Sequence, residues 1–341
     1  MSRNILITGG AGFIGSNYAA RCIARGETVT IFDNLSRAGA STNIAWLHST
    51  YGQNAFTLQV GDVRDFDAIR SAAAKADVIV HLAGQVAVTT SVINPRDDFE
   101  INALGTFNVL EAARASGRNP AVLYASTNKV YGGMEEVRVD ETPTQYRYTD
   151  FPLGIPETQP LDFHSPYGCS KGSGDQYVRD YHRIYGLPTI VLRQSCIYGT
   201  RQFGVEDQGW VAWFIIAAVT GRPITIYGDG KQVRDVLFVE DLLNAYDLAL
   251  ANLAVSAGQV YNIGGGPANT MSIWMDFESI LEKLLGRPVP ATRGDWRPGD
   301  QRIYVSDIRK AQQELGWAPR IGVTEGVERL YRWVLENRTL F

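Results

Sequence analysis

Short apolar segments alternate with helix-like stretches along the first 195 residues, and this alternation constrains the fold most. The segments are rich in β-branched residues and continuous, as expected of strands buried on both faces of a sheet. The predicted strands are Ile5–Ile7, Val29–Phe32, Phe56–Val60, Val78–Leu82, Val122–Tyr124 and Thr189–Leu192. The predicted helices are Phe13–Ala24, Phe66–Ala73, Phe99–Ala115 and Tyr167–Tyr185. This order predicts an α/β fold with a doubly wound parallel sheet.

The rhythm changes after about residue 195, where Gly, Pro, Trp and Arg become frequent and the elements shorten. Helices are still predicted there over Ser306–Gly316 and Thr324–Asn337. A length of 341 residues suits two domains. We therefore expect one domain over residues 1–195 and a smaller mixed α/β domain over residues 196–341, with short returns to the first.

The composition excludes several classes of function. A net charge of −4 offers no basic footprint for nucleic acid or an anionic membrane surface. We expect no signal peptide and no membrane span, because the apolar runs are too short. Three cysteines without a C-x-x-C pair favour a reducing compartment, here the cytoplasm. The four histidines lack ligand spacing, so we expect no metal site.

A glycine-rich loop, Thr8 to Gly15, follows the first predicted strand and opens the first predicted helix. Gly9 suits a tight turn, Gly12 lets the backbone approach a pyrophosphate, and Gly15 lets the helix pack against the strand. The helix N-terminus, Phe13-Ile14, offers free N–H groups and the positive end of the helix dipole. A turn that serves only helix packing is the alternative, but the strand, loop, helix and acid in order favour a dinucleotide site.

The acid is Asp33, which ends the second predicted strand. A carboxylate there accepts hydrogen bonds from ribose hydroxyls and repels a 2′-phosphate, which favours NAD over NADP. Asn34, Ser36 and Arg37 follow it as further candidate cofactor contacts. Arg37 is a counter-signal, because arginine can hold a 2′-phosphate, although a solvated loop cation is the favoured alternative.

Asp62-Val63, after the third predicted strand, marks the expected place of the adenine. A turn-forming Gly-Asp pair is an equal alternative for this segment.

The segment Ser165 to Lys171 reads as a helix start, with Ser165 as cap and proline in the first turn. Tyr167 and Lys171 then lie one turn apart on one face. An ammonium group there is expected to lower the pKa of the tyrosine and make it a general base near neutral pH. A surface pair is the alternative. Tyr227 to Lys231 repeats the spacing, but its glycines argue against a helix.

Ser126-Thr127 follows the fifth predicted strand, at a carboxyl end where such sheets bind ligands. A hydroxyl at this point can bind a substrate oxygen beside Tyr167. The alternative, hydroxyls that satisfy the local backbone, suits Ser126 better than Thr127.

These motifs resemble, in this order, those of the extended short-chain dehydrogenases/reductases that act on nucleotide sugars. They are T-G-x-x-G-x-x-G at residues 8–15, Asp33, Asp62-Val63, His81-Leu82-Ala83-Gly84, Asn102-x-x-Gly105-Thr106, Ser126-Thr127 and Tyr167-x-x-x-Lys171. The resemblance runs from Met1 to about Trp333 and implies a Rossmann domain that binds NAD. It also implies cofactor contacts from Leu82, Ala83, Gln85, Asn102, Ser126, Tyr167 and Lys171.

One part of this family, the 4,6-dehydratases, carries Thr-Asp-Glu after the fifth strand, and the two acids move protons when water is lost. This chain has Thr127-Asn128-Lys129, and an amide and an ammonium cannot do that work. The strongest resemblance is to the CDP-tyvelose (CDP-paratose) 2-epimerases, and the 4-epimerases are less similar. It is carried by residues 33–37, 84–91, 126–132, 161–172, 207–211 and 230–235.

The resemblance also implies substrate contacts, with the nucleotide end in the second domain. The residues are Gln85, Thr127, Asn128, Cys196, Arg201, Gln202, Arg234 and Arg297. The three arginines match family positions near the diphosphate, for which a guanidinium fork is well suited. Structural ion pairs with Asp235, Asp295 or Asp300 are the alternative. Cys196 departs from the pattern, because many relatives have asparagine there.

The implied function is an NAD-dependent epimerase that inverts C2 of a CDP-hexose, from CDP-paratose to CDP-tyvelose or from CDP-glucose to CDP-mannose. A carbinol C–H is too weak an acid to remove directly, so inversion needs transient oxidation with tightly bound NAD. Tyr167 would be the base, Lys171 would hold the ribose and bias Tyr167, and Thr127 would orient the oxygen. The alternatives are a UDP-glucose type 4-epimerase and a non-catalytic NAD-sensing module. Relatives associate, so we expect a homo-oligomer, a dimer or tetramer.

Overall fold

The computed structural model describes residues 2–297 and 300–341, which divide into two compact units. The first unit comprises Met1–Val130, Ser165–Arg193 and Tyr246–Tyr261, and the second comprises Tyr131–His164, Gln194–Ala245 and Asn262–Phe341. The second unit thus takes up residues 131–164, which precede residue 195. The first unit also includes residues 246–261, which come late in the chain.

The first unit contains strands and helices that alternate along the chain. Its strands are β1 (Asn4–Thr8), β2 (Thr28–Asp33), β3 (Thr57–Val60), β4 (Val78–His81), β5 (Ala121–Thr127), β8 (Thr189–Gln194) and β12 (Val260–Ile263). Its helices are α1 (Phe13–Ala24), α2 (Ala40–Tyr51), α3 (Phe66–Ala73), α4 (Val88–Ile93), α5 (Pro95–Phe99), the π-helix η1 (Glu100–Leu104), α6 (Gly105–Ala115), α7 (Ser165–Tyr185), the end of α9 (Val239–Ala251) and α10 (Leu253–Ser256).

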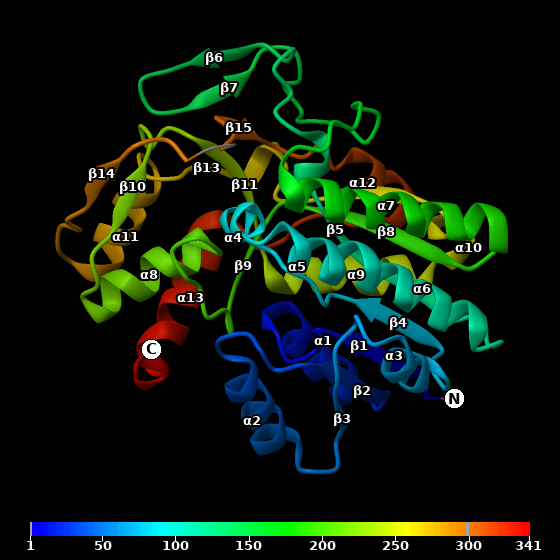
Figure 1. The fold of residues 1–341 in the computed structure, drawn as a ribbon. Coiled ribbons are helices and arrows are strands. Elements are labelled where there is room, and N and C mark those ends of the chain that lie inside the picture. The colour runs from blue at the N-terminus through cyan, green and yellow to red at the C-terminus, as the bar shows by residue number, and fades with distance from the viewer. Residues whose placement is uncertain (1, 298–299) are drawn as a thin grey trace. The chain divides into compact units, whose positions relative to one another are not determined.

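The strands form a seven-stranded sheet in the order β12-β8-β5-β4-β1-β2-β3 (Figure 1). The pairs β1–β2, β1–β4, β2–β3 and β4–β5 are parallel, with Ile7 opposite Ile31 on one side and Val80 on the other. The prediction of a doubly wound parallel sheet is confirmed. The order in which strands join the sheet reverses between β1 and β4: β2 and β3 lie on one side of β1, and β4 and β5 lie on the other. Such a switch point opens a crevice at the carboxyl ends of the strands.

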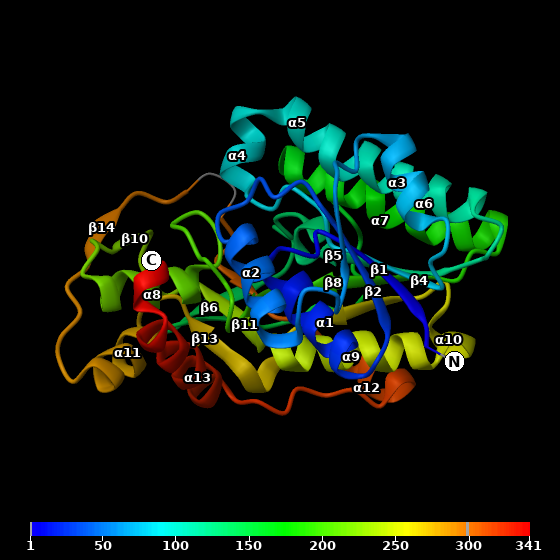
Figure 2. The same cartoon turned by 90° about the horizontal axis from the view of Figure 1, so that it is seen from below.

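Helices cover both faces of this sheet (Figure 2). The helices α3, α6 and α7 lie along one face, and α1 lies on the other with the end of α9, where the rings of Tyr18 and Tyr246 meet edge to face at 5.5 Å. The core between the sheet and the first layer includes Ile79, Val109 and Val178. This layering explains the continuous apolar strands, because side chains on both faces are buried.

Some predicted elements differ in the structure. The strand around Phe56–Val60 is not buried on both faces: β3 is an edge strand, and the side chain of Val60 is 64% exposed. The helix predicted over Phe99–Ala115 begins in η1 and continues as α6. The helix predicted from Ser306 begins at Arg309, because Ser306 instead forms a parallel β-bridge with Ile155.

The second unit has smaller sheets and its own helices. Its strands are β6 (Val139–Glu141), β7 (Tyr146–Tyr148), β9 (Cys196–Tyr198), β10 (Thr225–Tyr227), β11 (Val233–Phe238), β13 (Thr270–Ser272), β14 (Thr292–Gly294) and β15 (Ile303–Tyr304). Its helices are η2 (Asn128–Tyr131, shared with the first unit), α8 (Trp210–Thr220), the start of α9, η3 (Pro267–Asn269), α11 (Phe277–Leu285), α12 (Arg309–Leu315), α13 (Val323–Glu336) and η4 (Arg338–Leu340).

The strand β11 organises the second unit. It pairs with β9 and β15 in parallel and with β13 antiparallel, so Arg234 and Asp235 lie within a small sheet. Across residues 2–297 and 300–341, no helix is both long and apolar enough to cross a bilayer. The same residues hold no cluster of His, Cys, Asp and Glu suited to a metal ion.

Candidate functional site

The glycine-rich loop joins the end of β1 to the start of α1. Gly9 has a φ of +69°, and a Cβ there would lie 2.6 Å from the backbone nitrogen of Ala83, just after β4. A Cβ on Gly15 would lie 2.6 Å from Cα of Gly10. Both positions therefore require glycine, one for the turn and one for the close approach of the helix to the loop.

The N-terminus of α1 is open to an anion. Gly12 caps the helix without a side-chain hydrogen bond, so its cap residue leaves the N–H groups of the first turn, at Phe13 and Ile14, available to a ligand. A Cβ on Gly12 would meet the carbonyl oxygen of Gly9 at 3.2 Å, so this face of the loop is bare backbone. Uncapped N–H groups and the helix dipole together favour a phosphate group here.

Asp33 ties the end of β2 to the loop. Its Oδ2 accepts a hydrogen bond from the N–H of Ala11 at 3.0 Å, and its Oδ1 accepts one from the N–H of Leu35 at 2.8 Å. Partial burial raises the pKa of Asp33, while these N–H groups and the charge of Arg37 oppose the rise. Each carboxylate oxygen keeps a further lone pair, so a ribose hydroxyl can still bind.

Asn34 connects the loops that follow β2 and β3. Its amide donates to the carboxylate of Asp62 at 3.0 Å, and its Oδ1 accepts from the N–H and the hydroxyl of Ser36 at 3.1 and 2.7 Å. Asp62 also pairs with Arg64 at 2.8 Å, and hydrogen bonds from that arginine lower the pKa of Asp62 to about 2. The structure thus brings three of the predicted cofactor residues together.

Val63, Leu82 and Ala83 line this region in different ways. The side chain of Val63 is buried in the core, and its carbonyl accepts from the amide of Asn108 at 2.9 Å. The N–H groups of Leu82 and Ala83 donate to the carbonyl and the hydroxyl of Thr8 at 3.0 and 3.3 Å. Val63 therefore packs in the core, whereas the other two residues extend β4 alongside β1.

Tyr167 and Lys171 lie one turn apart on the buried face of α7, 8% and 6% exposed. Thr127, at the end of β5, shares a hydrogen bond with the phenol of Tyr167. The ammonium of Lys171 donates to the carbonyl of Ala125 at 2.6 Å and lies 4.2 Å from the ring centroid of Tyr124. The three candidate catalytic groups therefore meet at the carboxyl end of β5.

The expected fall in the pKa of Tyr167 is wrong for this structure. Burial raises the pKa of Tyr167 to about 12; the charge of Asp98 adds to the rise, and Thr127 and Arg37 oppose it. Burial also lowers the pKa of Lys171 to about 7. The loss of solvent around the phenolate outweighs the nearby cations, and the ammonium donates to a backbone carbonyl.

The residues around Thr127 have partners of their own. The hydroxyl of Ser126 donates to the buried carboxylate of Asp175 at 2.7 Å. The hydroxyl of Thr127 lies 3.4 Å from Oδ1 of Asn128 and accepts from the N–H of Lys129 at 3.3 Å. Asn128 and Lys129, where the dehydratases carry acids, thus stand directly beside the candidate catalytic threonine.

A buried amide network surrounds Asn102, which lies in the π-helix η1. Its Oδ1 accepts from the N–H of Gln85 at 3.0 Å, and its amide donates to the carbonyl of Gln85 at 3.0 Å and the carboxylate of Asp98 at 3.1 Å. The amide of Gln85 also donates to Asp98, at 3.2 Å. Single π turns inside helices often occur at functional sites, and this one contains Asn102 and links it by hydrogen bonds to Gln85, another predicted cofactor residue.

Asp98, Ser170 and Asp175 were not predicted as site residues. The hydroxyl of Ser170 donates to Asp98 at 2.5 Å, and Asp175 forms a buried ion pair with Arg193 at 2.9 Å. Asp98 lies four residues before a motif asparagine, and Asp175 lies four residues after Lys171. That helical spacing was the available signal.

The arginines predicted near the diphosphate have acidic partners within the second unit. Arg234 is 6% exposed, pairs with Asp300 at 2.7 Å and donates to the carbonyl of Gln301 at 2.7 Å. Arg297 pairs with Asp207 at 3.0 Å and lies over the ring of Tyr227, 4.0 Å from its centroid. Arg234 thus forms one of the alternative ion pairs, whereas the partner of Arg297 was not foreseen.

The other predicted substrate residues of the second unit lie along β9 and the loop that follows it. Cys196 begins β9 and is half-buried. Arg201 has a φ of +69° and lies 5.6 Å from the ring centroid of Trp333, and burial lowers its pKa. The side chain of Gln202 is 8% exposed, and its amide donates to the carbonyl of Ile197 at 3.4 Å.

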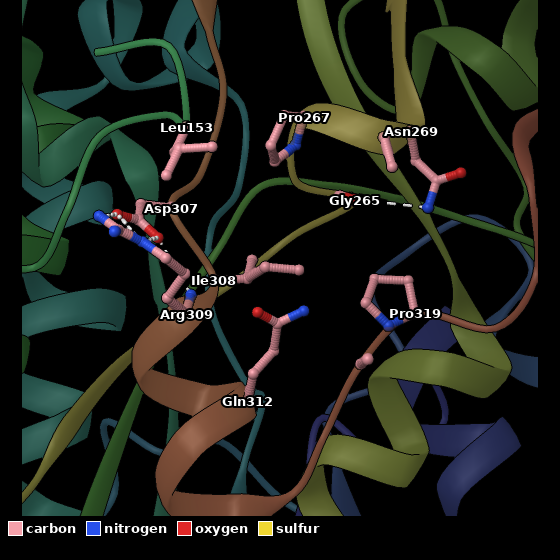
Figure 3. A pocket seen from close by; sticks show the side chains of 11 residues that line it. Leu153, Gly265, Pro267, Asn269, Asp307, Ile308, Arg309, Gln312 and Pro319 are labelled. Atoms are coloured by element: carbon pink, nitrogen blue, oxygen red, sulfur yellow. Dashed lines mark hydrogen bonds and ion pairs between the residues drawn. The ribbon is translucent and has the colours of Figure 1, made fainter.

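A separate pocket of about 240 Å³ lies within the second unit (Figure 3). Pro267, Ile308 and Pro319 give it an apolar lining, and the ion pair of Asp307 and Arg309, 2.6 Å long, lies at its wall. The pocket contains none of the predicted site residues.

The first unit fits a dinucleotide on three observations of its own. The loop after β1 is bare backbone, the first turn of α1 lacks a side-chain cap, and a carboxylate stands at the end of β2. A pyrophosphate needs backbone donors and a ribose needs an acceptor, so the donor and acceptor set matches both parts.

Known proteins resemble this chain over most of its length. Residues 6–330 match the family described as GDP-mannose 4,6 dehydratase. Over 336 residues the chain is 46% identical to a CDP-paratose 2-epimerase of Salmonella typhi, covering 96% of this chain and 98% of that protein.

Two solved structures are similar along their whole length. A UDP-glucose 4-epimerase of Thermotoga maritima with UDP-glucose gives a TM-score of 0.84 at 30% identity, covering 98% of this chain and 99% of that one. A double mutant of a dTDP-glucose 4,6-dehydratase of Streptomyces venezuelae with NAD gives 0.85 at 30%, covering 99% and 98%. Matches of this extent show that the chain belongs to the GDP-mannose 4,6-dehydratase family, within the extended short-chain dehydrogenases/reductases.

Proposed function

We propose that the protein is an NAD-dependent epimerase that inverts C2 of a CDP-hexose, from CDP-paratose to CDP-tyvelose or from CDP-glucose to CDP-mannose. The observation that carries the proposal is the group of Thr127, Tyr167 and Lys171 at the end of β5, followed by Asn128 and Lys129 instead of the dehydratase acids. The 46% identity to a CDP-paratose 2-epimerase supports the position of inversion and the nucleotide.

The cofactor would lie against the first unit. The loop at Gly9 and Gly12 and the first turn of α1 would hold the pyrophosphate, Asp33 would accept from the adenosine ribose, and Lys171 would donate to the other ribose. When bound, NAD supplies a reversible hydride acceptor, which an unactivated carbinol carbon needs before its configuration can change.

The chain's own residues handle the proton. The phenolate of Tyr167 would take the proton from the C2 hydroxyl and later return it. The hydroxyl of Thr127 hydrogen-bonds the same phenol and lowers its pKa, so it would orient the substrate oxygen and favour the phenolate. Asn128 cannot donate a proton as a carboxylic acid does, so sugar oxygens near it would be bound and retained.

The test is turnover of defined nucleotide sugars by purified protein without added cofactor. We expect conversion of CDP-paratose or CDP-glucose, with the product sugar identified by chromatography after acid hydrolysis, and little conversion of UDP-glucose. Tyr167→Phe should abolish turnover, whereas Tyr185→Phe, at a 53% exposed position of the same helix, should not.

Two outcomes would contradict the proposal. Conversion of UDP-glucose to UDP-galactose as the main activity would favour the 4-epimerase alternative. Bound NAD without turnover of any sugar would favour the NAD-sensing module.

We also propose that the protein is a homo-oligomer in the cytoplasm. Large apolar side chains are exposed on the adjacent helices α6 and α7, among them Phe107, Tyr177 and Ile184, which are 39%, 47% and 65% exposed. Exposed apolar patches of this kind mark association surfaces. Light scattering should show a dimer or larger, and Tyr177→Glu should shift it towards the monomer; a monomeric wild type would contradict this proposal.

A further inference from the structure

Asp98 is a buried carboxylate at the centre of the amide network. It lies on α5, and its side chain is 0% exposed. It accepts hydrogen bonds from the hydroxyl of Ser170 at 2.5 Å, the amide of Asn102 at 3.1 Å and the amide of Gln85 at 3.2 Å. One partner lies a turn away on the same helical segment, and the other two, Gln85 and Ser170, come from separate parts of the chain.

All three of these partners are neutral. In the part of the chain that the structure describes, no ion pair reaches Asp98. Asp175, a second buried carboxylate on α7, differs because the guanidinium of Arg193 donates to both of its oxygens at 2.9 Å. A buried carboxylate without a paired cation is costly and needs a reason.

The reason lies one residue beyond Ser170. Ser170 directly precedes Lys171 on α7, so the hydrogen bond to Asp98 fixes the backbone that carries the lysine. Lys171 is 6% exposed, and its ammonium donates to one backbone carbonyl. Burial lowers the pKa of Lys171 to about 7, and the charges of Asp175 and Asp98 both oppose that fall. Asp175 has the larger effect of the two but is already paired with Arg193, whereas Asp98 has three neutral partners and no paired cation among the described residues.

We propose that Asp98 is a positioning residue for Lys171. The buried negative charge of Asp98 keeps the ammonium of Lys171 protonated, and the hydrogen bond from Ser170 to Asp98 fixes the helix turn that carries the lysine. The inference deepens the proposed function and rests on it only where activity is measured. It explains why a carboxylate rather than an amide stands among three neutral donors.

Other charged groups near this site act more weakly or are already balanced. Glu100, next in sequence after α5, is paired with Arg96 at 2.8 Å. His81 lies near the ammonium, but burial lowers its pKa to about 3, so it is neutral at physiological pH. Asp98 raises the pKa of Tyr167, and Arg37 lowers it.

The direct test is the titration of Lys171 by NMR of protein labelled with ¹³C-lysine. The chain has six lysines, so the methylene signals are few: Lys75, Lys129, Lys171, Lys231, Lys283 and Lys310. The signal of Lys171 is assigned by its loss in Lys171→Arg. This titration is independent of any sugar substrate, so it stands even where the proposed activity fails.

Asp98→Asn keeps the size of the side chain and removes its charge. We expect the titration midpoint of Lys171 to move to lower pH by about one unit or more, the smallest shift typical of one close opposite charge. Asp97→Asn, on the same helix with its carboxylate 53% exposed, should leave the midpoint in place. Asp98→Ser provides a second neutral variant in case the amide disturbs folding.

Ser170→Ala separates charge from hydrogen bonding, because it removes one donor and keeps the carboxylate. The midpoint of Lys171 should then stay near that of the wild type. If both neutral variants leave the midpoint unchanged, Asp98 does not hold the ammonium protonated and the inference is overturned.

The pH profile of kcat/KM gives the second readout. In Asp98→Asn both limbs of the profile should move to lower pH, because Lys171 loses an attracting negative charge and Tyr167 loses a repelling one. A uniform loss of rate with both limbs in place would show a merely structural role and contradict the inference.

Discussion

Replacing Arg193 with methionine should destabilise the first unit by about 3 to 5 kcal/mol, the cost of leaving one partner of a buried ion pair alone. The two side chains are 3% and 0% exposed, and Nε and Nη2 of the arginine each donate to Asp175 at 2.9 Å. The hydroxyl of Ser126 and the amide of Gln176 would remain as donors at 2.7 and 2.8 Å, but two neutral donors are too little to balance a full charge. Methionine retains most of the buried volume, so the loss reports mainly on charge.

The assay is thermal unfolding at pH 7 followed by circular dichroism. For a unit of this size each kcal/mol is worth about 2–4 °C, so the midpoint should fall by roughly 6 to 20 °C. Arg114→Met is the matched control. Its arginine binds Glu111 with the same two-pronged geometry, at 2.8 and 2.6 Å, but lies at the surface, so the midpoint should barely move.

The double variant, Asp175→Asn with Arg193→Met, tests whether the lost stability comes from the unpaired charge. The double variant has no unpaired buried charge, so it should be more stable than Arg193→Met alone. A shift for Arg193→Met no larger than that for Arg114→Met would refute the reasoning. So would a double variant that loses the sum of the two single losses.

Three further predictions concern single side chains. Thr127→Val should lower kcat by roughly 10²-fold and move the limb of its pH profile that reports Tyr167 to higher pH, because the hydroxyl that it removes lowers the pKa of Tyr167. An unchanged limb would count against that hydrogen bond. Burial raises the pKa of Asp235 from 3.8 to about 6, so this group favours folding below about pH 4, and up to about 3 kcal/mol of that stability is lost as the pH rises to 6. In Asp235→Asn, urea unfolding should show that this dependence of stability on pH is removed. An equal dependence in the variant would contradict the prediction. Gly15→Ala should abolish NAD binding in calorimetry, because its Cβ would clash with the glycine-rich loop. Gly322→Ala, whose Cβ meets open space, should bind NAD normally. Normal binding by both variants would contradict the prediction.

The sequence predicts the elements that carry their own start signals. The helices α1 and α3 have the predicted bounds because one begins at the glycine-rich loop and the other at Asp65, whose side chain caps the N–H of Ala68 at 3.1 Å. The helix α2 was missed because it starts after a glycine with a φ of +83° and lacks a clear apolar stripe.

Long-range pairing is what local patterns cannot show. The strand β12 comes from residues 260–263, yet it lies beside β8 in the main sheet. Its four residues are buried, but a short apolar run alone does not tell a strand from a helix segment.

In the candidate site too, local spacing predicts some features, and others depend on tertiary packing. The spacing of Tyr167 and Lys171 indicates that they share a face of one helix, which the structure bears out. Their pKa directions depend on burial, which comes from tertiary packing, so the sequence-based expectation for the tyrosine was wrong. The role of Asp98 depends on three segments that meet only in the fold.

The most direct test of the proposed function is proton NMR of CDP-paratose with purified protein in D₂O and no added cofactor. Couplings of the C2 proton to those on C1 and C3 report the configuration at C2. The account predicts new signals with a manno-type C2 whose C2 proton is retained rather than exchanged for deuterium. Inversion at C4 instead, or deuterium at C2 of the product, would contradict it.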